Sequence, residues 1–84
     1  MRVRLTRRRL AVLTAIHEQG ETAPSGICHA TGFGPGTVYP ALDIFERAGW
    51  IGRKPHPTRR GVSVYHLTYR GQLGAGLQPK DTTQ

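Results

Sequence analysis

The feature that most constrains the fold of this chain is a change in the spacing of its apolar residues at Gly49. Before Gly49, apolar side chains recur every three or four residues, which is typical of amphipathic helices. After it, residues 62–67 alternate between apolar and polar side chains, which is typical of a half-buried strand. The sequence therefore predicts a helical first part followed by a small β-structure.

The first two expected helices are bounded by capping residues and glycines. The first begins after Thr6, a suitable N-cap, and ends at Gly20. The second spans residues 22–31, with Thr22 as its expected N-cap and Gly32 as its stop. The side chains expected to face the core are Leu10, Val12, Leu13, Ile16, Ile27 and Ala30.

The third expected helix covers about residues 36–48 and ends at Gly49. Pro40 fits this helix only if the first helical residue is about Thr37, because the amides of a first turn have no partner within the helix. Its core-facing residues are expected to be Val38, Leu42, Phe45 and Ala48.

Two short strands, at residues 50–53 and 62–67, are predicted to form a hairpin around a Pro-rich loop at residues 54–61. Trp50 and Tyr65 are expected to pack this hairpin, or wing, onto the helices. Thr68 can cap one last turn or short helix. The sequence thus predicts an α+β, mainly α, winged helix-turn-helix domain at residues 1–71, with three helices and a two-stranded wing, and a flexible Gly-rich tail at residues 72–84.

Size and cysteine usage restrict the class of protein. A chain of 84 residues has room for one domain. We expect a cytoplasmic protein, associated with the nucleoid when bound to DNA, because the sequence contains neither a signal peptide nor an apolar run of about 18 residues. Cys28 is the only cysteine and is expected to be a buried or half-buried filler. We expect no metal, no cofactor and no catalysis, because no phosphate-binding loop, nucleophile elbow or metal-ligand spacing occurs.

Positive charge is concentrated in two parts of the chain. Residues 1–9 contain five arginines and no acid, and residues 50–71 contain five cations and no acid. The segment between them, residues 10–49, has four acids and Arg47 as its only Lys or Arg. Clusters of cations without acids favour a polyanionic partner, since each neutralised phosphate releases condensed counterions.

Three stretches resemble the PadR family of winged-helix transcriptional regulators: residues 36–42 (GTVYPAL), residues 46–51 (ERAGWI), and residues 65–68 (YHLT) with Gly71. The first stretch is the most specific, and the others are shared with winged helices such as the MarR family. The resemblance covers about residues 6–71. Members of the family continue into long C-terminal helices that build a dimer, whereas only 16 residues follow Thr68 here. A homodimer and an effector therefore stay open, and no small-molecule ligand is evident.

The resemblance and the charges together predict a sequence-specific regulator of transcription, expected to be a repressor, that binds double-stranded DNA. The N-terminal end of the third helix would enter the major groove, while the wing and the Arg-rich N-terminus would contact the backbone or a minor groove. The third helix has no Lys or Arg before Arg47, so affinity is expected to come from the two basic clusters. The predicted DNA-binding residues are Thr37, Val38, Tyr39, Arg53, Lys54, Arg59, Arg60, Arg7 and Arg8.

Three other functions are compatible with the same residues. An architectural or recombination accessory protein of a mobile element would bind DNA without sequence preference. A protein-interaction winged helix would show no salt-dependent affinity for DNA. An RNA-binding protein is less well supported, because the sequence has neither an RNA-binding motif nor a set of stacking aromatics.

Overall fold

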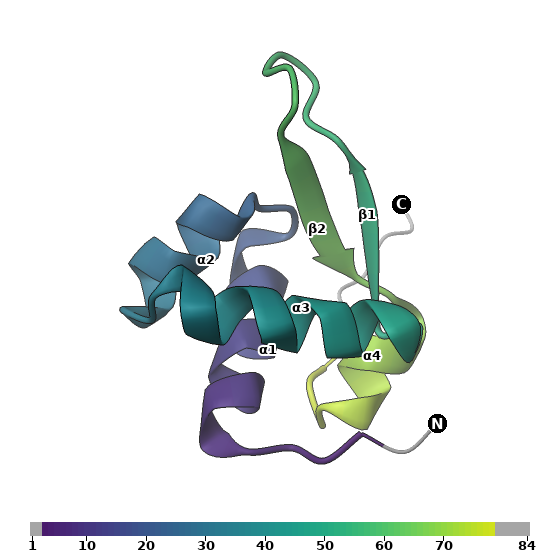
Figure 1. The fold of residues 1–84 in the computed structure, drawn as a ribbon. Coiled ribbons are helices and arrows are strands. Elements are labelled where there is room, and N and C mark those ends of the chain that lie inside the picture. Colours follow the sequence, from purple (N-terminus) through teal and green to yellow (C-terminus); the bar gives the residue numbers. More distant parts are fainter. Residues whose placement is uncertain (1–2, 79–84) are drawn as a thin grey trace.

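The computed structural model describes residues 3–78, and within that range four helices surround the base of a two-stranded hairpin (Figure 1). This arrangement is the predicted winged helix-turn-helix with one short helix added at its C-terminal end. In chain order the elements are α1 (Arg7–Gln19), α2 (Pro24–Thr31), α3 (Pro35–Arg47), β1 (Ile51–Pro55), β2 (Ser63–Leu67) and α4 (Tyr69–Gly74).

The ends of α1 follow the capping signals of the sequence. The Thr6 hydroxyl accepts a hydrogen bond from the Arg9 amide at 3.2 Å, so Thr6 is the N-cap. Gly20 ends the helix with a φ of 81°, and Gly32 ends α2 in the left-handed conformation with a φ of 77°. Both glycines occupy backbone conformations that L side chains rarely adopt. The predicted stops are confirmed.

The start of α2 differs from the prediction. Its N-cap is Ala23, and Pro24 is its first residue. Thr22 lies outside the helix, where its amide donates to the Tyr65 carbonyl at 3.0 Å and its carbonyl accepts from the Tyr65 amide at 2.8 Å. The prediction that Thr22 caps α2 is therefore wrong, because this β-branched residue pairs with β2 in an extended conformation instead.

The start of α3 also differs. The helix begins at Pro35 after the N-cap Gly34, so Pro40 lies within the helix and not in its first turn as predicted. Pro40 has no amide hydrogen and cannot donate to the carbonyl of Gly36. Both residues are exposed, so water can reach that carbonyl and the lost bond costs less than it would in the core.

The core lies where α1, α2, α3 and the base of the hairpin meet. Phe45 is fully buried and its ring stacks on that of Trp50, with 5.9 Å between the ring centroids. Trp50 and Tyr65 are buried, as predicted for residues that pack the wing onto the helices, and Cys28 is half-buried. The largest fully buried side chains are Phe45, Leu13, Ile16, Ile27, Leu42, Val12 and Val38.

Two residues expected in the core are exposed instead. Leu10 is 38% exposed, and Ala30 also faces solvent. Both line a surface groove between α1 and α2, where no other described element covers them. The expectation that they face inward is wrong, because helical spacing places them on an apolar stripe but does not show how far the neighbouring elements reach.

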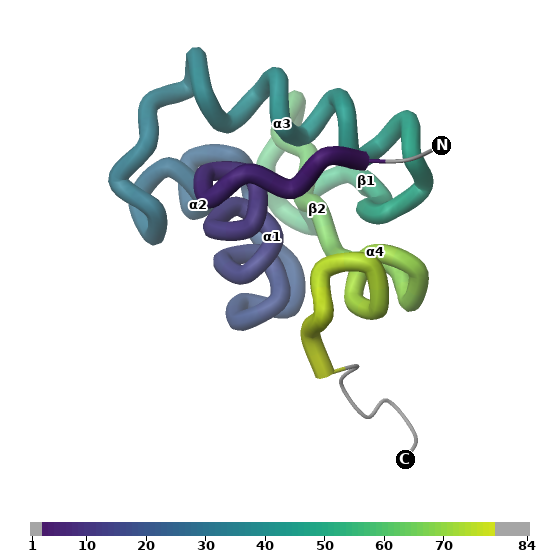
Figure 2. Tube along the Cα trace, turned by 90° about the horizontal axis from the view of Figure 1, so that it is seen from below, coloured from purple at the N-terminus to yellow at the C-terminus, as the bar shows by residue number. Residues whose placement is uncertain are grey.

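The hairpin pairs β1 and β2 in antiparallel register from Ile51 opposite Leu67 to Pro55 opposite Ser63. Its tip projects away from the helices (Figure 1). The N-terminal segment and α4 lie at the opposite end of the molecule (Figure 1), which is the end that faces the viewer in Figure 2.

The fourth helix packs against Trp50. A Cβ at Gly71 would overlap the Trp50 carbonyl oxygen, and one at Gly74 would lie 2.5 Å from the indole ring. Thr68 caps this helix, as predicted. Since α4 runs through the expected boundary at residue 71, the division into domain and tail stays a prediction. Residues 79–84, the last six of the thirteen residues in the expected flexible tail, lie outside the described range.

Candidate nucleic-acid interface

The N-terminal half of α3 presents Tyr39 to solvent. Its side chain is 54% exposed, which excludes the core role that an aromatic residue at this position could have had. Thr37, two residues earlier, is half-buried. The prediction that Val38 contacts DNA is wrong. Its side chain is fully buried and cannot reach a base, because it lies on the core face of the helix with Leu42 and Phe45.

Both cations at the base of the wing are held by carboxylates of other elements. Arg53 Nε lies 3.4 Å from Glu46 Oε2 on α3, and Lys54 Nζ lies 2.5 Å from Glu21 Oε2 in the turn between α1 and α2. All four side chains are between 36% and 53% exposed, so these are solvent-accessible ion pairs. The two predicted contact residues thus brace the hairpin against the helices in the free protein.

The tip of the wing carries Arg59 and Arg60, which are exposed and form no ion pair with another described residue. The imidazole of His56 shapes this tip. Its Nδ1 accepts hydrogen bonds from the backbone amides of Thr58 and Arg59, each at 3.1 Å. As the acceptor of both hydrogen bonds, the ring fixes the turn from which Arg59 projects. Sequence reasoning treated His56 only as part of a Pro-rich loop.

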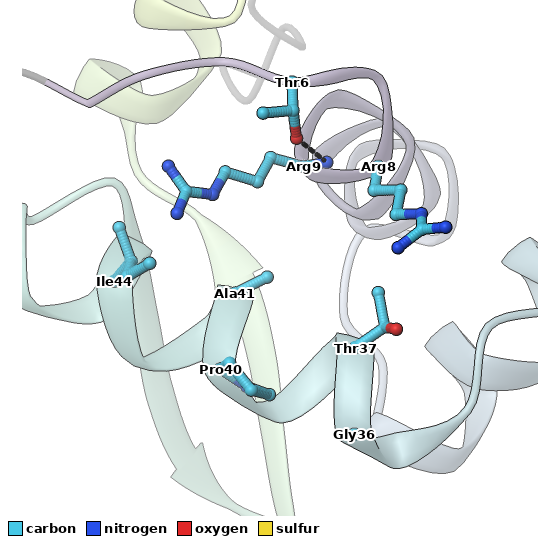
Figure 3. Close-up of a pocket in the computed structure, with 8 residues that line it drawn as sticks. All are labelled: Thr6, Arg8, Arg9, Gly36, Thr37, Pro40, Ala41 and Ile44. Atoms are coloured by element: carbon cyan, nitrogen blue, oxygen red, sulfur yellow. Dashed lines mark hydrogen bonds between the residues drawn. The ribbon is translucent and has the colours of Figure 1, made fainter.

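A third group of cations lies at the N-terminal end of α1. Arg7 and Arg8 are exposed there. Exposure is what the predicted contacts with the DNA backbone require. Arg8, Arg9 and Thr37 line a groove of about 310 Å³ between α1 and α3. Figure 3 shows the Arg8 guanidinium on the side of Thr37 and that of Arg9 on the side of Ile44.

Arg9 has a second role that the sequence did not indicate. Its Nη1 donates to the Arg4 carbonyl at 2.8 Å and so ties the N-terminal segment to α1. The floor of the groove is apolar and is provided by Pro40, Ala41 and Ile44 of α3.

The three regions follow one another across the molecule. The N-terminal end of α1 lies on one side of α3 and the wing tip on the other (Figure 1). A rod-shaped polyanion crossing α3 would therefore meet free cations on both sides of the helix. The roles of the individual contact residues stay predictions.

Within residues 3–78 no three His, Cys, Asp or Glu side chains gather as they would around a metal ion. No helix in that range is both long and apolar enough to cross a bilayer.

Comparisons with known proteins give both a family and a fold. The MarR family model matches residues 5–60. No curated protein sequence matches the chain. The motif-based likeness to the PadR family is not among the matches and stays a prediction, whereas the broader winged helix-turn-helix class is confirmed.

Solved structures share the fold at low sequence identity. The PcaV transcriptional regulator of Streptomyces coelicolor, in complex with its natural ligand, has a TM-score of 0.81 at 19% identity over 86% of this chain and 51% of its own. A mutant MarR from E. coli complexed with operator DNA has a TM-score of 0.79 at 22% identity, covering 86% and 51%. Streptococcus pneumoniae FabT in complex with DNA has a TM-score of 0.74 at 28% identity, covering 82% and 48%. This chain therefore spans about half the length of the structures it matches.

Proposed function

The chain belongs to the MarR family, and from this premise we propose that it is a regulator of transcription, without catalytic activity, that binds double-stranded DNA in a sequence-specific manner. The expected effect is repression, since a domain of this size bound near a promoter would hinder polymerase. Residues 36–42 would act as in PadR-like proteins, with the N-terminal end of α3 in the major groove. The protein would act in the cytoplasm, on the DNA of the nucleoid.

The observation that carries this proposal is the position of the free cations on both sides of α3. Arg59 and Arg60 at the wing tip and Arg7 and Arg8 on α1 are exposed, and no described carboxylate pairs with them. Duplex DNA presents a negative charge about every 1.7 Å along its axis, so cations on both sides of a helix in the major groove would meet phosphates. MarR from E. coli and FabT from S. pneumoniae, which share this fold, have each been solved with DNA.

The test is a fluorescence-anisotropy titration of labelled duplexes, random and promoter-derived, over a range of salt concentrations. We expect affinity to fall steeply with salt and one duplex pool to be preferred. Replacing Arg59 and Arg60 together with Gln should make the salt slope shallower by about 1.8, at roughly 0.9 for each phosphate contact. Arg70→Gln is the control, because Arg70 lies on α4 at the end of the molecule far from the wing tip.

The outcomes separate this function from the alternatives. Salt-dependent binding without preference indicates an architectural protein. No binding at low salt excludes the DNA function and favours a protein partner. A salt slope that Arg59→Gln and Arg60→Gln leave unchanged contradicts the role of the wing. Sedimentation with and without the preferred duplex would show whether two copies bind together, as regulators with palindromic sites do.

A further inference from the structure

The outward face of α3 has an unusual composition for a helix that would enter the major groove. Opposite its buried side lie Pro35, Gly36, Tyr39, Pro40, Asp43 and Arg47, all of them exposed. The first four of these carry no charge. Contact with bases would therefore fall to neutral groups in the first half of the helix.

The usual bidentate contacts to bases are not available on this face. Guanine is most often read by Arg or Lys, and adenine by Asn or Gln. From Pro35 to Glu46 the helix has none of these four residue types. Arg47 lies in the last turn, and its Nε is 3.2 Å from Asp43 Oδ2, so the one cation of the helix and the nearest carboxylate neutralise each other.

Beside Pro35 at the start of the helix, the apolar groups that remain on this face are the rings of Tyr39 and Pro40. They are neighbours in the sequence, and both are exposed. The pyrrolidine ring is rigid, so its contact with a ligand costs little conformational entropy. Proline at this position costs the helix one backbone hydrogen bond. Burial in the core does not offset that cost, because Pro40 is exposed at the groove between α1 and α3.

Among the groups that base pairs present in the major groove, the apolar one is the C5-methyl group of thymine. We propose that α3 reads thymine through contact of this methyl with Pro40 and with the ring of Tyr39. The preferred duplex then carries thymines at the positions facing the N-terminal half of α3, flanked by the phosphates that the free cations contact. This inference rests on the proposed function and adds the chemistry by which a preferred sequence is chosen.

The test uses the duplex selected from a random pool by the full chain. Replacing its thymines with deoxyuridine removes the methyl groups and keeps every hydrogen-bonding group of the base. We expect affinity to fall about fourfold for each methyl in contact, as for one buried methylene. Equal affinity for the two duplexes overturns the proposal while leaving DNA binding intact. Failure to bind any duplex overturns the proposed function itself.

Protein variants show whether α3 is responsible. Pro40→Ala should bring the ratio of the two affinities closer to one, and it should not unfold the chain, because alanine restores the missing amide donor. The matched control is Pro57→Ala, the same change at an exposed proline of the wing loop, which should leave the ratio as in the parent. A ratio that Pro40→Ala does not change, or that Pro57→Ala changes equally, overturns the assignment.

Discussion

Replacing Glu21 with Gln should weaken the fold slightly and strengthen DNA binding. In the free protein Glu21 holds Lys54 in an ion pair that braces β1 against the turn between α1 and α2. The side chains are 52% and 47% exposed, and such pairs contribute about 0.2–1 kcal/mol. For a domain of this size the melting temperature should therefore fall by about 1–8 °C.

The effect on DNA binding has the opposite sign. Without Glu21, the Lys54 ammonium is free to pair with a phosphate, which adds one contact and makes the salt slope steeper by about 0.9. Between 50 and 200 mM salt, the gain in affinity over the parent should then shrink by about 3.5-fold. Anisotropy titrations at these two salt concentrations, with thermal unfolding of the same samples, measure both effects.

Glu18→Gln is the matched control, since it removes the same charge from α1, and Glu18 forms no ion pair with another described residue. Lys54→Gln in the Glu21→Gln background should abolish the change in slope. The reasoning is refuted if Glu21→Gln leaves the slope as in the parent, or if Glu18→Gln changes it equally. In either case Lys54 stabilises the position of the hairpin and does not contact a phosphate once Glu21 is replaced.

Three further changes test the parts that support the interface. Thr68→Val removes both hydrogen bonds of the hydroxyl that caps α4. It should lower the free energy of unfolding, measured by urea denaturation, by about 1–2 kcal/mol, whereas Thr68→Ser should keep most of the parent's stability. Gly74→Ala should destabilise by about 1–3 kcal/mol because its methyl meets the Trp50 indole, and a gain in stability would contradict that packing. His56→Ala removes the acceptor for two amides of the wing tip and should reduce DNA affinity without changing the salt slope; equal affinity would show that the tip needs no such support.

Local signals in the sequence were sufficient for most of the fold. Thr6, Gly20 and Gly32 mark helix ends through chemistry that acts within a few residues, and the structure places the ends there. The hairpin followed from the alternating residues of β2. Where the prediction failed, a distant element decided the outcome. Thr22 pairs with Tyr65, which is far away in the sequence and which no local pattern could have indicated.

Pro40 shows the limit of a local rule. The cost of proline in a helix interior argued for a start at Thr37, yet α3 begins at Pro35. A proline at the first position has a backbone angle suited to the helix, and the buried face formed by Val38, Leu42 and Phe45 holds the segment in place. Tertiary packing thus outweighed the loss of one exposed hydrogen bond.

The candidate site was predicted in part. The two basic clusters could be read from the sequence, because charge density needs no knowledge of the fold. The pairing of Arg53 with Glu46 and of Lys54 with Glu21 could not, because it depends on how the hairpin lies against the helices. Val38 was wrongly included among the DNA-contacting residues. The sequence places it on an apolar stripe, but only the structure shows that its side chain is fully buried.

The ion pairs also explain how an acidic middle segment can coexist with DNA binding. Asp43, Glu46 and Glu21 would repel phosphates if they were free, and each instead has a cation within 3.4 Å. Two of these pairs include residues of α3, and the third joins β1 to the turn between α1 and α2. Exposed cations without an ion pair to another described residue lie at the wing tip and at the start of α1. Affinity that depends on salt would then come from the two sides, and the choice of sequence from a helix face with little net charge. On this division, changes to Tyr39 or Pro40 should alter sequence preference at constant salt slope, and changes to Arg59 or Arg60 should do the reverse.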